Sequence, residues 1–119
     1  MPKASFVLKR VYEAPADNDG RRVLVDRLWP RGVARATARI DLWLKDAAPS
    51  HDLRKRFHGA PSLWDEFVAA YDAELASDPA HTAALSLLEH AGVTTLLFAA
   101  REPHRNNAAA LKTWLEARR

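Results

Sequence analysis

The chain has 119 residues, of which 48% are hydrophobic and 28% charged, a composition typical of one globular domain. It contains no cysteine, which excludes disulfides, cysteine-ligated zinc, iron–sulfur clusters and thiol nucleophiles. The net charge of +3 is unevenly spread, because residues 1–58 carry 13 Lys and Arg against 7 Asp and Glu, whereas residues 59–119 carry 5 against 8. The first residues form neither a secretory signal nor a membrane span, so we expect a cytoplasmic protein without membrane contact.

The first half of the chain predicts mainly extended structure. Residues 5–12 are rich in β-forming side chains and predict a strand, and residues 13–20 predict a loop of Pro, Asn, Asp and Gly. Residues 22–29 predict a second strand whose alternate side chains are largely apolar on both faces. Such a strand favours a sheet that is covered on both sides. Residues 40–45 alternate and predict a short extended segment.

The second half predicts helices around one more strand. The expected caps are Ser50 and Ser62 at the starts of two helices and Gly92 at the end of a third. The expected elements are helices over 51–58, from Ser62 through Leu75, over 79–91 and over 105–117, with a buried strand over 93–100. This order predicts an α/β fold, a small three-layer single domain over residues 1–119 with a mainly parallel sheet flanked by helices.

Two strand ends carry the candidate binding residues. In parallel sheets ligands bind beyond the carboxyl ends of the strands. If the second and last strands are parallel neighbours, the segments 26–32 and 101–107 meet there, with the N-terminus of the last helix beside several arginines. The ligand-binding candidates are Arg27, Trp29, Arg31, Gly32, Arg54, Arg101, Asn106 and Asn107. One of the two asparagines could instead cap the helix.

Asp26 and His58 are the catalytic candidates. Asp26 would act as a base or orient an arginine, although Asp26 and Arg27 could equally form an internal ion pair or tether the loop. His58 shares a helix face with Arg54 and would transfer protons, or it could simply place a cation at the helix end. The remaining histidines show no metal-ligand spacing, and His81 lies on an expected surface helix. We expect no cofactor and no metal, although Asp26 and Glu102 could serve as metal ligands.

The string KRVYEAPADNDGRRVLVDRLWPRG, followed by LRKRFHG and TLLFAAREPHRNNAAALKTWL, resembles the YeaO-like family of small bacterial proteins. The resemblance covers residues 9–115 and implies a compact cytoplasmic α/β fold without an established activity. Its motifs fall on residues 26–32 and on Arg54, Phe57 and His58. In the family the last motif resembles Asn-His or Asn-Glu before Ala, whereas this chain has Asn106 and Asn107 there. The resemblance therefore favours His58 as the proton-transfer residue, or a protein that only binds its ligand.

The hypothesis favoured by the sequence is a domain that binds a small phosphate- or carboxylate-bearing ligand, with the question of an enzyme left open. The alternative is nucleic-acid binding through an exposed basic face in the first half. That face would need Arg21, Arg22, Arg35, Arg39, Lys55 and Arg56. A third alternative is an interaction module, monomeric or homodimeric, that uses Trp43 or Trp64 at an interface.

Overall fold

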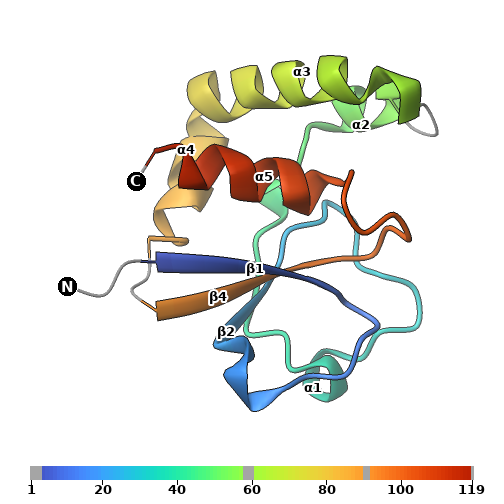
Figure 1. Cartoon of the computed structure of the whole chain (residues 1–119), viewed down its shortest axis with the longest axis vertical. Helices are drawn as coiled ribbons and strands as arrows, with labels where there is room; N and C mark the ends of the chain where they lie inside the picture. The colour runs from blue at the N-terminus through green and yellow to red at the C-terminus, as the bar shows by residue number, and fades with distance from the viewer. Residues whose placement is uncertain (1–3, 58–60, 90–91, 119) are drawn as a thin grey trace.

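Four strands form one sheet in the order β1-β4-β2-β3, and every pairing in it is parallel (Figure 1). The computed structural model describes residues 4–57, 61–89 and 92–118. The strands are β1 (Ala4–Arg10), β2 (Arg21–Leu24), β3 (Leu42–Trp43) and β4 (Gly92–Phe98). Because all strands run the same way, their carboxyl ends lie at one edge of the sheet. The predicted α/β class with a parallel sheet is confirmed.

The second strand is shorter than the sequence predicts. β2 pairs with β4 in the register Val23↔Leu96, and the last ladder bond runs from the Val25 amide to the Leu97 carbonyl at 3.1 Å. The next amide of the neighbouring segment, that of Ala99, binds the Asp26 carboxylate instead of a backbone carbonyl. The ladder therefore stops, and Asp26 lies in the loop beyond β2 rather than within a strand.

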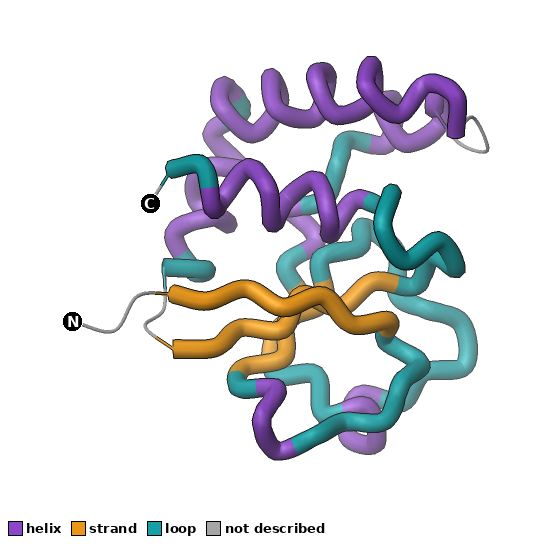
Figure 2. Tube along the Cα trace, in the orientation of Figure 1, coloured by secondary structure: helices purple, strands orange, loops and turns teal. Residues whose placement is uncertain are grey.

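Helices cover one face of the sheet (Figures 1 and 2). They are α2 (His51–Phe57), α3 (Trp64–Ser77), α4 (Pro79–Ser86) and α5 (Asn107–Glu116). Val23 and Val25 point to this side and join a buried cluster with Tyr71 of α3 and Leu111 of α5. The alternation that the sequence predicts for this strand is confirmed on the helix side.

The opposite face of the sheet has a thinner cover. Leu24 and Leu97 point to this side and pack with Val11 and Ile40. The covering layer consists of loops and the four-residue helix α1 (Arg35–Ala38), which lies below the sheet in Figure 1. Both faces are nevertheless buried, as the two-sided apolar pattern of β2 predicts.

The helix boundaries differ in part from the sequence-based prediction. Ser50 caps α2, because its Oγ accepts a hydrogen bond from the Leu53 amide at 3.1 Å. Ser62 is not a cap: it lies in a 3₁₀ turn, and Leu63, which has no capping side chain, precedes α3. The helix predicted over 79–91 is α4, which ends at Ser86. Gly92 therefore begins β4 with a φ of 101° and caps no helix.

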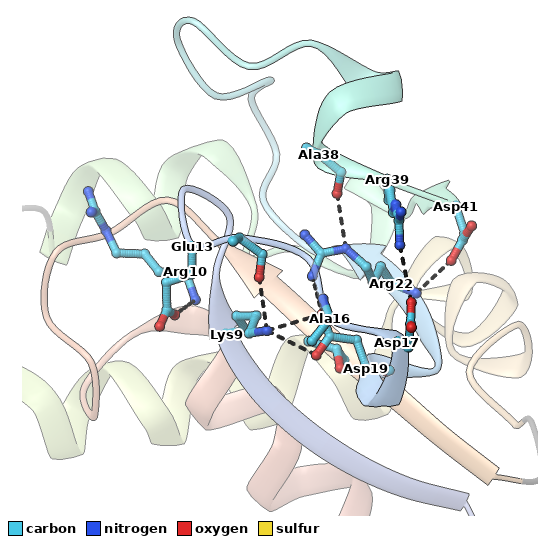
Figure 3. A network of polar contacts seen from close by, with 12 residues as sticks. Lys9, Arg10, Glu13, Ala16, Asp17, Asp19, Arg22, Ala38, Arg39 and Asp41 are labelled. Atoms are coloured by element: carbon cyan, nitrogen blue, oxygen red, sulfur yellow. Dashed lines mark hydrogen bonds and ion pairs between the residues drawn. The ribbon is translucent and has the colours of Figure 1, made fainter.

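A buried ion cluster fixes the loop between β1 and β2 (Figure 3). The Asp19 carboxylate lies 3.0 Å from Lys9 Nζ and 2.6 Å from Arg22, and it also accepts from the Ala16 amide at 3.0 Å. Arg22 is only 2% exposed, and its Nε donates to the Ala38 carbonyl at 3.0 Å. Gly20 follows with a φ of 65°, and a Cβ there would meet the Val93 carbonyl oxygen at 2.2 Å. This position therefore requires glycine.

Within the described residues, the helices lack the combination of length and apolar character that a membrane crossing needs.

Candidate functional site

A cavity of about 710 Å³ lies at the carboxyl edge of the sheet. Its walls come from the loop after β2, the segment after β4, the helices α2 and α3, and the start of α5. Because β2 and β4 are parallel neighbours, parts of the two predicted segments meet there, namely residues 26–30 of the first and residues 102 and 105–107 of the second. The volume is within the range of roughly 300–1,000 Å³ that small-molecule sites occupy.

Asp26 forms part of the cavity wall and is held by neutral donors. Its Oδ2 accepts from the Ala99 amide at 3.0 Å, and its Oδ1 accepts from Asn107 Nδ2 at 3.0 Å. Its backbone carbonyl accepts from Trp43 Nε1 at 2.8 Å. Burial raises the pKa of the Asp26 carboxyl above its ordinary value, and the two hydrogen bonds and the charge of Arg54 offset only part of this rise.

Arg27 lines the same cavity and tethers a loop. Its Nε donates to the Pro49 carbonyl at 2.9 Å and its terminal nitrogen to the Ala48 carbonyl at 3.3 Å. These bonds join the end of β2 to the chain just before α2. Among the described ion pairs Arg27 has none with Asp26, so of the two structural alternatives the tether is the one observed.

Of the other arginines near the site, two line the cavity and two do not. Arg54 on α2 lines the cavity, and so does Arg105 just before α5. Arg31 and Arg101 are exposed and do not line it. Arg105 lies in the segment 101–107 that the sequence singles out, but the sequence gives Arg101 as the candidate. Only the path of the loop shows that Arg105, and not Arg101, borders the cavity.

Trp29 and Pro30 reach the cavity, whereas the turn at Arg31 and Gly32 does not. The Trp29 Nε1 donates to the Val33 carbonyl at 2.8 Å, and the Trp29 ring lies edge-on to Trp43 with 5.2 Å between centroids. Gly32 is exposed with a φ of 75° and is not part of the cavity wall. The Arg31 carbonyl accepts from the Tyr12 hydroxyl at 3.0 Å. This turn therefore shapes the loop instead of facing the cavity.

The two asparagines have different roles. Asn106 caps α5, because its Oδ1 accepts from the Ala109 amide at 2.8 Å while its Nδ2 donates to the Glu102 carbonyl at 2.9 Å. Asn107 donates instead to Asp26 and, at 3.1 Å, to the Val25 carbonyl. Capping by one of the two residues is confirmed, and the other joins the ends of β2 and α5.

Glu102 is the second acidic residue of the wall, and it is already engaged. Its Oε2 accepts from the His104 amide at 2.5 Å and from the Arg105 amide. These backbone donors lower the pKa of the Glu102 carboxyl below its ordinary value. The described part of the chain holds no group of three or more His, Asp or Glu side chains suited to a metal ion.

The histidines give no proton-transfer group within the described cavity wall. His58, the second catalytic candidate, lies outside the described residues. His81 is buried rather than solvated, which corrects the expectation of a surface residue: it is 2% exposed, and its Nε2 lies 2.7 Å from the Ala48 carbonyl. The sequence misplaces it because α4 packs against the segment before α2 through this side chain.

The wall contains three aromatic side chains that sequence reasoning did not assign to a site. They are Phe57 at the end of α2 and Trp64 and Phe67 in the first turns of α3. Helical periodicity places all three on the apolar face, and they do pack against the core cluster. Only the meeting of α2 and α3 at the carboxyl edge of the sheet shows that they also border a cavity. Trp64 of the interface hypothesis thus lies in this wall, whereas Trp43 does not line the cavity and packs against Trp29.

A family model described as "Inactive DUF488-N3 subclade" matches residues 5–119. The chain is 43% identical over 109 residues to "Uncharacterized protein Rv3073c" of Mycobacterium tuberculosis, which covers 92% of each chain. It is 39% identical over 109 residues to "Uncharacterized protein YeaO" of Escherichia coli, which covers 92% of this chain and 95% of that relative. No solved structure gives a significant match. The chain therefore belongs to the YeaO-like family, whose function is unknown, within the DUF488-N3 subclade described as inactive.

Proposed function

We propose that this protein binds a small anionic ligand, bearing a phosphate or carboxylate group, in the cavity at the carboxyl ends of β2 and β4. The observation that carries the proposal concerns Arg54 and Arg105. Both line the cavity, and neither guanidinium has a hydrogen bond or ion pair with the described residues. Free guanidinium groups on two different elements at one cavity form the donor arrangement that recognises phosphate and carboxylate groups.

The acidic residues of the wall do not cancel these charges. Glu102 is bound to two backbone amides of its own loop. Asp26 forms no ion pair with Arg54 or Arg105 among the described residues, and its oxygens accept from neutral donors. Arg54 and Arg105 therefore supply positive potential that no carboxylate in direct contact neutralises.

The first turn of α5 adds a second source of positive potential. The helix is ten residues long, and Asn106 satisfies the Ala109 amide. The amides of Asn107 and Ala108 have no partner among the described residues. Since helix N-termini carry a partial positive charge, an anion beside Asn107 gains from both the amides and the helix dipole.

The observations support binding without turnover. The family description calls the subclade inactive. The resemblance implies His or Glu at the position of Asn107, and an amide cannot exchange protons at neutral pH as those groups do. Asn107 instead holds Asp26 in place.

The basic half does not form the free face that nucleic-acid binding would need. Arg22 is buried with Asp19, and Arg39 lies 3.5 Å from Asp17. Arg21 donates to the Leu87 carbonyl. Arg35 donates to the Ile40 carbonyl at 3.2 Å and to the Asp41 carbonyl at 3.3 Å. Four of the six required cations are thus engaged within the protein, which favours the small-ligand proposal.

Calorimetric titration and thermal shift with inorganic phosphate, citrate and ribose 5-phosphate test the proposal. A ligand present at 100 times its Kd should stabilise the protein by about 2.7 kcal/mol. We expect at least one of these probes to bind. Arg54→Gln together with Arg105→Gln should weaken that binding by about tenfold or more, since each charge-assisted hydrogen bond contributes about 1.5 kcal/mol or more.

Arg31→Gln together with Arg101→Gln is the matched control. This variant loses the same net charge, and the two positions do not line the cavity. We expect its affinity to stay close to that of the parent protein. Equal losses in the two double variants would mean that overall charge, and not this site, attracts the anion. The absence of binding by any of the three probes would refute the proposal.

A further inference from the structure

The wall of the cavity is divided by chemistry. One side is aromatic and comes from α2 and α3. The Trp64 and Phe67 rings are stacked with 5.6 Å between centroids and 28° between planes, and Phe57 lies edge-on to Phe67 at 5.9 Å. All three side chains are only partly buried, so they retain surface toward the cavity that they line. An aromatic wall of this kind favours a planar, unsaturated ring.

The other side of the cavity presents hydrogen-bond acceptors. Each Asp26 oxygen accepts one hydrogen bond from the protein and keeps a lone pair for another. Asn107 uses its Nδ2 for Asp26 and Val25, while its Oδ1 has no partner among the described residues. A ligand that fits this side must carry hydroxyl or amino donors in addition to its anionic group.

We propose, on the basis of the anion-binding function above, that the ligand is a ribonucleoside monophosphate. The phosphate would lie against Arg54 and Arg105, and the base would lie on the aromatic wall of Phe57, Trp64 and Phe67. The hydroxyl or amino donors of the nucleoside would bind Asp26 and Asn107. A bare phosphate would use only the first of these three features, and a sugar phosphate would leave the aromatic wall without a partner.

Comparison of ligands that contain successive parts of a nucleotide tests this inference. The probes are inorganic phosphate, ribose 5-phosphate, the four ribonucleosides and the four ribonucleoside monophosphates, titrated by calorimetry and by tryptophan fluorescence. We expect at least one monophosphate to bind about tenfold or more tightly than ribose 5-phosphate, the gain typical of one base stacked on an aromatic side chain. Binding should also change the tryptophan emission.

Substitution of Trp64 tests the assignment of the wall. Trp64→Leu should bring the affinity for the monophosphate down to that for ribose 5-phosphate and leave ribose 5-phosphate binding unchanged. Trp64→Phe keeps an aromatic ring and should retain most of the gain, which separates a lost stacking surface from a loss of folding. Trp114→Leu is the matched control, because Trp114 borders a different cavity at the opposite end of α5.

The outcomes separate this inference from the function on which it rests. Equal affinities for ribose 5-phosphate and every monophosphate would overturn the nucleotide assignment and leave the anion site standing. Nucleosides that bind as tightly as their monophosphates would overturn the anion-binding function itself. A loss of ribose 5-phosphate binding in Trp64→Leu, with the fold intact by circular dichroism, would also overturn the assignment of that wall to a base.

Discussion

The strand β2 has an aspartate near each end, and the two carboxylates differ in their partners. Asp19 precedes the strand, is 6% exposed, and contacts Lys9 and Arg22 directly. Asp26 follows the strand and is held by the Ala99 amide and the Asn107 side chain, both neutral. The difference shows in the direction of the pKa shifts, which are opposite.

At Asp19, burial acts to raise the pKa of the carboxyl. The hydrogen bonds from Ala16, Lys9 and Arg22, together with the charge of Lys9, outweigh burial and lower this pKa below its ordinary value. At Asp26, burial outweighs the neutral donors and the more distant charge of Arg54, so the pKa is raised. A carboxylate paired with cations stabilises the fold, whereas one held by neutral groups at a cavity remains available to a ligand.

The largest effect we expect is from Asp19→Asn. This change leaves Lys9 and the buried Arg22 without a counter-charge, and breaking a buried pair in this way costs about 3–5 kcal/mol. Urea denaturation should show the loss as a lower midpoint. The matched control is Asp17→Asn, because Asp17 is fully exposed and lies 3.5 Å from the exposed Arg39. If both variants were equally stable, the cluster in Figure 3 would not hold the loop.

The pH dependence of stability should separate the two carboxylates by sign. Because the folded pKa of Asp19 is lowered, its contribution is present above the unfolded value of about 3.9 and is lost as pH falls through the folded pKa. The folded pKa of Asp26 is raised, so its ionisation costs stability above that folded pKa, and the cost disappears as pH falls toward the unfolded value. As pH falls, the parent protein should therefore lose its stability advantage over Asp19→Asn, and its stability relative to Asp26→Asn should increase.

Urea denaturation of the three proteins between about pH 3 and pH 7 measures these differences, in a range that spans the unfolded aspartate pKa of about 3.9. Parallel pH profiles for the two variants would contradict the opposite environments of Asp19 and Asp26.

The neighbouring asparagines allow a smaller and more specific test. Asn107→Ala removes a donor that lowers the pKa of Asp26, so that pKa should rise further, as measured by carbon-detected NMR titration of the carboxyl. Asn106→Ala is the control: it removes the cap of α5 and should cost about 1 kcal/mol of stability without moving the pKa of Asp26. A shift of this pKa in Asn106→Ala alone would contradict the assigned hydrogen bonds.

The smallest change in stability is expected for Asp26→Asn at neutral pH. The amide keeps the shape of the carboxylate and one acceptor while removing the cost of burying a charge, so the free energy of unfolding should change by less than about 1 kcal/mol. Removing this charge should also strengthen phosphate binding, because Asp26 lines the same cavity as Arg54 and Arg105. A severe loss of stability would place Asp26 with Asp19 as a purely structural residue.

Local patterns predicted most of the fold. The two-sided apolar pattern around Val23 and Leu24 correctly indicated a covered sheet, and the spacing of Trp64, Phe67 and Tyr71 located the main helix. The errors lie at boundaries. Ser62 has the chemistry of a cap but falls in a 3₁₀ turn, because the chain enters α3 through Pro61–Leu63. Capping propensity is weaker than the geometry that packing imposes on such an entry.

The candidate site was predicted less completely than the fold. The segments around Asp26 and Asn107 were located because polar residues directly after buried strands are conspicuous in the sequence. The aromatic wall was not, since Trp64 and Phe67 at helical spacing carry the same signal whether they face a core or a cavity. His81 was wrongly assigned to the surface, because no local sequence pattern distinguishes an exposed histidine from one that packs against another segment of the chain.

The sequence by itself determined the α/β class, the two strand ends that bear the charges and the family to which the chain belongs. These properties depend on residue order and short-range periodicity, which the chain carries before it folds. The sequence already named Arg54, but the tertiary structure alone decided that Arg105 borders the cavity with it and Asp26, whereas Arg31 and Arg101 do not. The reason is physical: the direction of an arginine side chain depends on the path of its loop, and contacts between residues far apart in sequence set that path.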